Sequence, residues 1–310
     1  MRLLYIILSY ERPKALGECI RTALDNTAIK PDMMYILDDC SNPDLQHSLL
    51  NFAHTSHTHP FPINLVLNRA NLGVGHQFQT AYNLIAQHNP DIVCIIEGDY
   101  FFRRGWIDDV CALFLAAPHT IAIPGCDHAD MYQREKTHGS FVELMKEQYG
   151  EDVGNRNHMY DAFDLDTATG VMKVFGASNS CGCQILHWKR IREFLFQDLG
   201  AEAEYWKGMN RGFHVGLDRT RASDAHMSGT HTYLHYKWML KNGIDTSKHF
   251  AYLNIADASI AFHAANQGIN GKLDPRFFPE GGCFKGVNGG HFQKDYDTFS
   301  RADIQEVTFV

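Results

Sequence analysis

The chain has 310 residues, of which 45% are hydrophobic, and a formal net charge of −8 at pH 7. This size and composition are those of a globular protein with a sizeable core. The acidic balance argues against broad, non-specific nucleic-acid binding, and eight cysteines in so long a chain do not make a disulfide scaffold. No apolar run reaches the roughly 18 residues that a membrane span needs, so we expect a cytoplasmic protein without one.

The first 125 residues alternate short apolar runs with segments of helical periodicity. Strands are predicted at residues 3–8, 34–37, 63–67, 92–96 and 120–124. Helices are predicted at residues 13–24, 44–54, 74–88 and 105–116. Strands separated by helices of this length are typical of an α/β protein with a parallel, doubly wound sheet.

The regular alternation ends near residue 125. We interpret residues 127–170 as loops with one helix near 140–149, and then predict further elements with less regular spacing. These are strands at 171–175 and 252–255, and helices at 186–196 and 230–242, the second ending at Asn242-Gly243. Residues 262–296 are rich in Gly, Asn and aromatic side chains, which suits a functional C-terminal lid.

The fourth predicted strand ends on two carboxylates, Glu97 and Asp99, which share a side-chain parity and flank Gly98. Ligands of open α/β sheets bind beyond the carboxyl ends of the strands, and two hard oxygen ligands suit Mg²⁺ or Mn²⁺. A plain polar turn would have the same composition. The same edge also offers Asp38, Asp39 and Asn71.

The chain lacks the glycine-rich loops that bind phosphate directly. Neither a G-x-G-x-x-G sequence after the first strand nor a Walker A sequence is present. Asp and Asn side chains can bond a base or ribose, whereas a phosphate needs a cation between itself and Asp99. The combination fits a metal-bound sugar nucleotide better than NAD or ATP.

Four short motifs stand at the ends of successive predicted strands: Leu8-Ser-Tyr-Glu-Arg-Pro13, Leu37-Asp-Asp-Cys-Ser-Asn42, Asn71-Leu-Gly-Val-Gly75 and Glu97-Gly-Asp99. In order and spacing they resemble the GT-A glycosyltransferases, most of all the large inverting family two, which includes bacterial and phage enzymes. The resemblance covers residues 1–125 well and the rest loosely. It implies a Rossmann-like GT-A fold with a mostly parallel sheet, and a metal-dependent, inverting transfer from a UDP-sugar to an acceptor hydroxyl.

The resemblance also implies a division of labour within one continuous domain. Residues 1–125 would bind the nucleotide-sugar donor, and residues 126–310 would form the acceptor-binding and catalytic half with the C-terminal lid. Donor contacts would come from Asp38 or Asp39, which would contact the uracil and ribose, with Ser9 and Glu11 beside the nucleotide. Asn71 is a further candidate at the same edge.

The D-x-D motif of the family corresponds to residues 97–99. Asp99 is thereby implied as the ligand of Mn²⁺ or Mg²⁺, and Glu97 as a contact to the ribose or a metal-bound water. His263, after a late strand, matches a position where many GT-A enzymes have an extra metal or phosphate ligand. A lone histidine is also commonly an ordinary polar residue.

Two departures from the family pattern affect the site. Gln79 stands where the family usually has Asn, which suggests an altered donor pocket. The Glu-Asp pair that carries the general base is absent, because counting back from Gly243 leads to His231-Thr232. The base is therefore assigned to Asp224, with His231 as the alternative, although Asp224 could equally cap the segment that follows.

The acceptor is open. A saccharide is the family default, whereas a hydroxymethylated base in phage DNA, with the enzyme in the host cytoplasm, is the alternative. Residues 186–249 support the second with ten Lys or Arg against seven Asp or Glu and with six His. Two functions of other classes also remain, a nucleotidyltransferase that makes sugar nucleotides and a non-catalytic nucleotide-sugar binding module.

Overall fold

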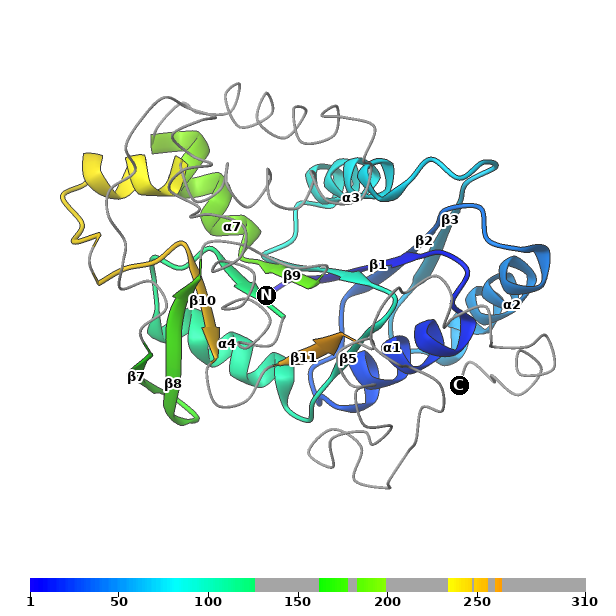
Figure 1. Cartoon of the computed structure of the whole chain (residues 1–310), viewed down its shortest axis with the longest axis horizontal. Coiled ribbons are helices and arrows are strands. Elements are labelled where there is room, and N and C mark those ends of the chain that lie inside the picture. The colour runs from blue at the N-terminus through cyan, green and yellow to red at the C-terminus, as the bar shows by residue number, and fades with distance from the viewer. Residues whose placement is uncertain (126–161, 178–182, 199–233, 247, 256–259, 264–310) are drawn as a thin grey trace, which may run out of the picture.

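The computed structural model of the chain describes residues 1–125, 162–177, 183–198, 234–246, 248–255 and 260–263 (Figure 1). Within these residues lie a mixed sheet in the order β3-β2-β1-β4-β9-β6-β10-β8-β7 and a separate strand pair, β11-β5. The strands are β1 (Leu3–Ser9), β2 (Met33–Asp38), β3 (Ile63–Leu67), β4 (Ile92–Glu97), β5 (Tyr100–Phe102), β6 (Ala122–Pro124), β7 (Phe163–Thr167), β8 (Gly170–Ala177), β9 (Cys183–Leu186), β10 (Tyr252–Ile255) and β11 (Ala261–His263). The helices are α1 (Pro13–Asp25), α2 (Pro43–His54), η1 (Thr55–Thr58), α3 (Val74–His88), α4 (Trp106–Ala116), α7 (Trp188–Arg190) and η2 (Ile191–Asp198).

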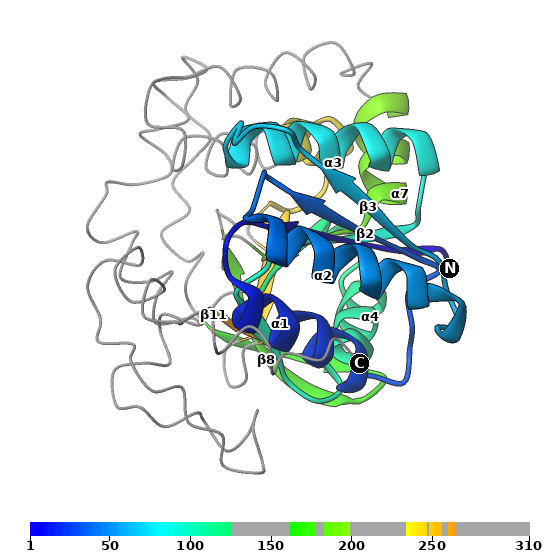
Figure 2. The ribbon, with the colours of Figure 1, turned by 90° about the vertical axis from the view of Figure 1, so that its right-hand side faces the viewer.

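Helices cover both faces of the sheet. Figure 2 shows α3 and α7 on one face, and α1, α2 and α4 on the other. All seven residues of β1 are therefore buried, as expected for a parallel strand between two helical layers. The ring of Tyr5 on β1 lies 5.6 Å from that of Trp106 on α4, measured between ring centroids. This contact joins the strand to the helical layer beneath it.

The chain reverses its direction of travel across the sheet beside β1. It runs from β1 through β2 to β3 on one side, and then returns to place β4 on the other side of β1, with all three pairings parallel. Such a switch point leaves a crevice at the carboxyl ends of the two strands that flank it, and ligands of α/β sheets bind there. The polar strand ends identified in the sequence therefore meet at the switch point.

The predicted elements of the first 125 residues are confirmed. The bounds of β3 and α3 agree to the residue, and the other elements agree to within one or two residues. The structure contains a three-residue strand, β5, that was not predicted from the sequence; it follows β4 after a turn of only two residues. A second addition is β9, which lies between β4 and β6 and is antiparallel to both. The sheet is consequently mixed, and its parallel parts are β3-β2-β1-β4 and the pair β6-β10.

The second half differs from the prediction in two places. The interpretation of residues 163–167 as loop is wrong, since they form β7, which pairs with β8. Leu186 belongs to β9, so the predicted helix begins two residues later, at Trp188. Strand β10 is confirmed, as are helix 234–241 and its termination at Asn242-Gly243, where Gly243 has φ +65°. Residues 140–149 and 264–296 lie outside the described residues.

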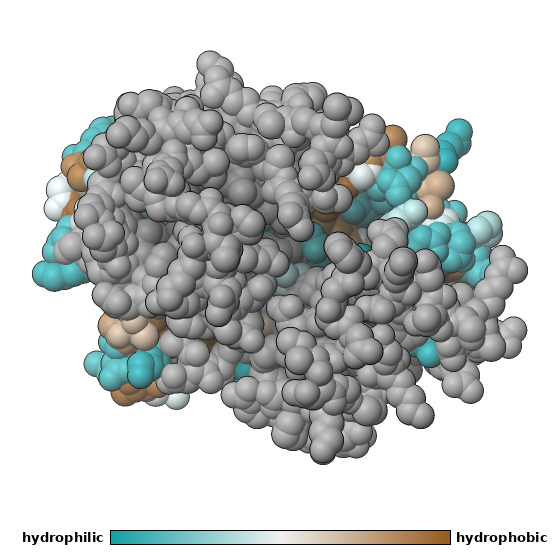
Figure 3. Space-filling model, in the orientation of Figure 1, coloured by the Kyte–Doolittle hydropathy of each residue, from teal (hydrophilic) through white to brown (hydrophobic). Residues whose placement is uncertain are grey.

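The core is apolar, and the described surface is mixed. Cys19 and Cys94 are fully buried, and burial raises the pKa of the Cys94 thiol well above its usual value, so it packs as a small apolar side chain. Figure 3 shows hydrophilic residues interspersed with apolar ones on the coloured part of the surface. Among the helices described, none combines the length and the apolar character that crossing a bilayer demands.

Candidate functional site

The switch point brings polar residues of three neighbouring strands to one level. In the strand register Ser9 lies opposite Asp38, and Leu8 lies opposite Glu97. The Oγ of Ser9 donates to Oδ1 of Asp38 over 3.2 Å, and both side chains are buried. Three of the residues predicted from sequence to bind the donor thus stand together at the carboxyl ends of β1, β2 and β4.

The Asp38 carboxylate is fully engaged within the protein. Besides Ser9, it accepts from the main-chain N of Ser41 at 2.9 Å, from the Oγ of Ser41, and from Nε2 of Gln46 at 3.1 Å. Two carboxylate oxygens offer about four acceptor positions in all. All are filled in this arrangement, so Asp38 holds the end of β2 against the start of α2.

The Asp39 carboxylate holds the loop that leads into α3. Its oxygens accept from Nδ2 of Asn68 and the main-chain N of Leu72, each at 2.9 Å, and from the main-chain N of Gly73 at 2.7 Å. One acceptor position therefore remains on Asp39. Asn71 lies in the same loop, and its side chain is exposed.

Glu11 ties the loop after β1 to the start of α2. Its carboxylate accepts from the main-chain N and, at 2.7 Å, from Nδ2 of Asn42, the N-cap residue of that helix. Its own main-chain N donates to Oγ of Ser41 at 2.9 Å. Glu11 has φ +50°, in the left-handed region, which is uncommon for a residue with a side chain. These bonds fix the bend between β1 and α1.

The buried amide of α3 is Gln77, which the sequence analysis did not single out. Its Nε2 donates to the main-chain oxygens of Ser9 and Leu37, at 2.9 and 2.8 Å. Gln79 is exposed, two residues further along the helix and hence on another side of it. The side chain that supports the strand ends from α3 is therefore that of Gln77.

A two-residue turn, Gly98-Asp99, joins β4 to β5. Because β4 ends at Glu97, the side-chain alternation predicted from sequence does not continue to Asp99. The main-chain N of Gly98 donates to the main-chain O of Leu8 at 2.8 Å. A Cβ at this position would lie 2.9 Å from that same oxygen. The close approach of β1 to the turn therefore requires glycine.

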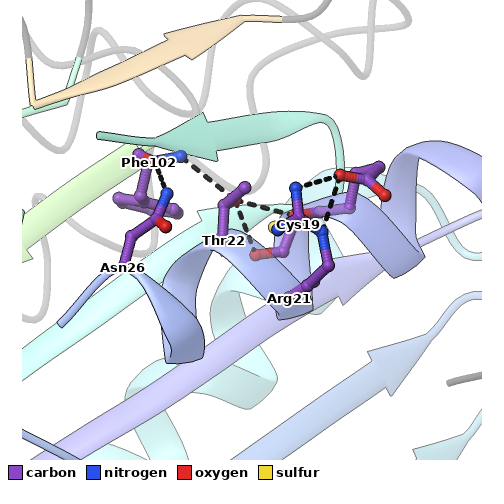
Figure 4. Close-up of polar contacts among 6 residues, drawn as sticks. Cys19, Arg21, Thr22, Asn26 and Phe102 are labelled. Carbon is purple, nitrogen blue, oxygen red and sulfur yellow. Dashed lines mark hydrogen bonds and ion pairs between the residues drawn. The ribbon is translucent and has the colours of Figure 1, made fainter. Parts of the chain in front are cut away.

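Helix α1 and strand β11 hold the residues after the turn from two sides. Figure 4 shows Oγ1 of Thr22 accepting from the main-chain N of Phe102, at 3.1 Å, and Nδ2 of Asn26 donating to its main-chain O, at 2.6 Å. Along the other edge of β5 runs β11, whose His263 lies opposite Tyr100 in the register. The main chain of His263 thus lies one residue pair from Asp99, and a ligand role for its side chain stays a prediction.

Asp99 forms an ion pair with Arg12, from the loop between β1 and α1. Nη1 of Arg12 donates to Oδ2 of Asp99, whose side chain has no exposed surface, whereas that of Arg12 is 33% exposed. The charge of the buried carboxylate is thereby balanced by a cation that reaches solvent. Arg12 belongs to the motif after the first strand, but its contact with Asp99 is seen only in the folded structure.

The chemistry of Asp99 suits a divalent cation, but the position beside it is taken. A carboxylate oxygen at the crevice is the kind of ligand that Mg²⁺ and Mn²⁺ prefer. Among the residues described, no three His, Cys, Asp or Glu side chains are grouped so as to hold a metal ion, and the guanidinium of Arg12 bonds Asp99. A metal ion at Oδ2 of Asp99 would therefore have to displace the guanidinium of Arg12. The two candidate bases, Asp224 and His231, lie outside the described residues.

The fold, with polar strand ends at its switch point, is that of an α/β domain of the GT-A class. The model of glycosyl transferase family 2 matches residues 5–174, more than half of the chain, and the chain belongs to that family. The fold and family implied by the four sequence motifs are thereby confirmed. Among curated protein sequences, none matches the chain.

Solved structures of glycosyltransferases resemble the chain at low identity. The mannosyltransferase PcManGT from Pyrobaculum calidifontis, in complex with GDP-Man and Mn²⁺, is 17% identical, with a TM-score of 0.47 over 85% of this chain and 57% of that one. Residues 1–349 of S. aureus TarS are 12% identical, with a TM-score of 0.47 over 86% and 61%. Mouse xyloside xylosyltransferase 1 is 9% identical, with a TM-score of 0.43 over 84% and 96%. The chain thus spans about three fifths of the length of the first two.

Proposed function

We propose that the protein is a metal-dependent, inverting glycosyltransferase that moves a sugar from a UDP-sugar to an acceptor hydroxyl. The observation that carries the proposal is the strand register at the switch point, which aligns Ser9 with Asp38 and ends β4 on Glu97 beside them. Membership of glycosyl transferase family 2 supplies the reaction class.

The nucleoside is proposed to lie against the loop that Asp39 organises. Asp39 keeps one acceptor position for a base N–H or a ribose hydroxyl, whereas Asp38 has none left. The exposed amide of Asn71 can add a donor from the rim. Ser9 and Glu11 act through the hydrogen bonds that hold the ends of β1 and β2, and Glu97 is proposed to contact the ribose or a metal-bound water from the end of β4.

Asp99, with His263 as a further ligand, would hold Mn²⁺ or Mg²⁺. The bound cation supplies Lewis-acid stabilisation of the leaving UDP. Asp224, or His231 in its place, accepts the proton of the acceptor hydroxyl, and the resulting oxygen forms its bond to the anomeric carbon as the bond to UDP breaks. Attack from the face opposite UDP inverts the anomeric configuration.

The acceptor is proposed to be a saccharide. A DNA acceptor would bring affinity for the duplex that falls steeply with salt. A binding assay on duplex DNA at two salt concentrations therefore separates the two acceptors. Salt-sensitive binding in the range of the donor affinity would assign the reaction to DNA.

The test of the donor site is the variant Asp99→Asn. In the wild-type protein, UDP together with Mn²⁺ should raise Tm by several degrees, because a ligand at 100 times its Kd stabilises the fold by about 2.7 kcal/mol. Asp99→Asn should lose both this stabilisation and sugar transfer. The matched control is Asp109→Asn, which changes an Asp paired with Arg103 away from the turn. Retention of transfer and Mn²⁺-dependent UDP binding by Asp99→Asn would disprove the assignment.

A further inference from the structure

Resting on the function proposed above, we propose that Arg12 gates the metal position: it occupies Asp99 until a donor diphosphate draws it away. The structural observation is the ion pair between the Arg12 guanidinium and Oδ2 of Asp99. Asp99 is fully buried and Arg12 is one-third exposed. One partner is thus enclosed in the protein, and the other reaches solvent.

The position of Arg12 is built into the fold. Arg12 is the N-cap residue of α1, and its side chain forms no capping hydrogen bond there. The preceding residue, Glu11, has a left-handed conformation that three hydrogen bonds to Ser41 and Asn42 maintain. Pro13 follows at the first turn of the helix and restricts the backbone of Arg12 to non-helical conformations. The backbone on both sides therefore directs this side chain toward the β4–β5 turn.

The same position cannot hold the guanidinium and a divalent cation together. A metal ion bonds a carboxylate oxygen at about 2.1 Å, and the guanidinium already donates to Oδ2 of Asp99. The two cations would also repel each other strongly at such a separation in a buried site. Arg12 therefore lowers the affinity of the donor-free protein for the metal.

A diphosphate changes this balance because it offers new acceptors to the guanidinium. Arginine pairs with phosphate oxygens in a bidentate geometry and is less strongly hydrated than an ammonium group. A donor in the switch-point crevice can attract Arg12 from Asp99, which leaves the carboxylate oxygen open to the metal. Metal and donor then bind cooperatively, and each raises the affinity for the other by the same factor.

The variant Arg12→Gln tests this gate by a measurement that does not depend on catalysis. Free Mn²⁺ is quantified by electron paramagnetic resonance in titrations of the protein, with and without UDP. In the wild-type protein, UDP should raise the affinity for Mn²⁺ by about 10- to 100-fold, the usual range of such couplings. In Arg12→Gln, the affinity for Mn²⁺ alone should rise about 10-fold, and the enhancement by UDP should shrink. Arg12→Lys keeps the charge without the planar fork and should lie between the two.

The control is Arg21→Gln, which removes an exposed arginine paired with Glu18 on the same helix and should match the wild-type protein. The thermal unfolding of each variant verifies that it is folded, and Arg12→Lys replaces Arg12→Gln if the latter is not. If Mn²⁺ binds the wild-type protein and Arg12→Gln with the same affinity, and UDP enhances both equally, the gate is wrong while the proposed function stands. If no variant binds Mn²⁺ even with UDP, the metal-dependent function and the gate fail together.

Discussion

The variant Gly98→Ala tests how tightly the β4–β5 turn is fitted against β1. The added Cβ would lie 2.9 Å from the main-chain oxygen of Leu8 and 3.1 Å from Cδ1 of Leu16. The leucine side chain can rotate away, but the oxygen belongs to a buried strand and accepts the hydrogen bond from Gly98 itself. The turn must therefore shift by several tenths of an ångström. Overpacking of this kind costs about 1–3 kcal/mol of the free energy of unfolding.

The shift also moves Asp99, the next residue, so that Gly98→Ala should weaken Mn²⁺-dependent UDP binding as well as the fold. Urea unfolding monitors the first effect, and calorimetric titration with UDP and Mn²⁺ the second. The control is Gly105→Ala, where φ is +70° and the nearest atom to the added Cβ is 4.0 Å away. This control should lose about 1–2 kcal/mol through backbone strain and retain donor binding. If Gly98→Ala matched the wild-type protein in both assays, the steric argument would be refuted.

Three further variants probe the supports of the site. Gln77→Leu removes two side-chain hydrogen bonds to main-chain carbonyls, those of Ser9 and Leu37, although the carbonyl of Ser9 still accepts from the main-chain N of Asp39. The variant should lower the free energy of unfolding by about 1–3 kcal/mol in urea. Thr22→Val keeps the shape but removes the acceptor of the Phe102 N–H, with a loss of similar size; an unchanged urea midpoint would contradict either bond. Burial, and to a lesser extent the positive charge of Arg190, lowers the pKa of His187 to about 4. The usual value in the unfolded chain is about 6.5. Between pH 6.5 and pH 4 the unfolded chain therefore binds a proton at His187 that the folded protein does not. The free energy of unfolding should fall by about 2 kcal/mol as the pH falls through this range, after allowance for partial exposure. His187 is the N-cap residue of α7, and its Nδ1 accepts from the main-chain N of Arg190. His187→Asn keeps an acceptor there and should show a correspondingly weaker dependence of urea unfolding on pH; equal pH dependence would exclude the histidine.

The parallel half of the fold could be predicted from sequence because its signals are local. Each strand from β1 to β4 is an apolar run, and Pro13 and Pro43 stand at the starts of two helices, where proline is favoured. The clustering of polar residues at the strand ends could be predicted from the same local patterns, because parallel strands end at one edge of a sheet. Which of these residues are neighbours then depends on the order of the strands in the sheet.

The remaining features depend on contacts between distant segments. Strand β5 has three residues and follows β4 after two, too short for a period to be recognised. Gln77 and Gln79 lie on different sides of α3, one buried and the other exposed. The position in a motif alone does not show which of the two is buried. The contact of Arg12 with Asp99 joins residues on two different strand-end loops, and no spacing rule predicts such a pair. The orientation of single side chains therefore could not be predicted from the sequence pattern.

The strand order has a consequence for how the protein folds during synthesis. One edge of β4 is covered only by β9, from Cys183 to Leu186, and β5 pairs with β11, after residue 260. Until those segments leave the ribosome, the nascent N-terminal half presents an apolar strand with unpaired main-chain groups. Such an open edge recruits other chains, and pairing over so long a sequence separation is slow. The placement of the β4–β5 turn between early strands and the later strands β9 and β11 therefore makes the growing chain dependent on protection from aggregation until those two strands are made.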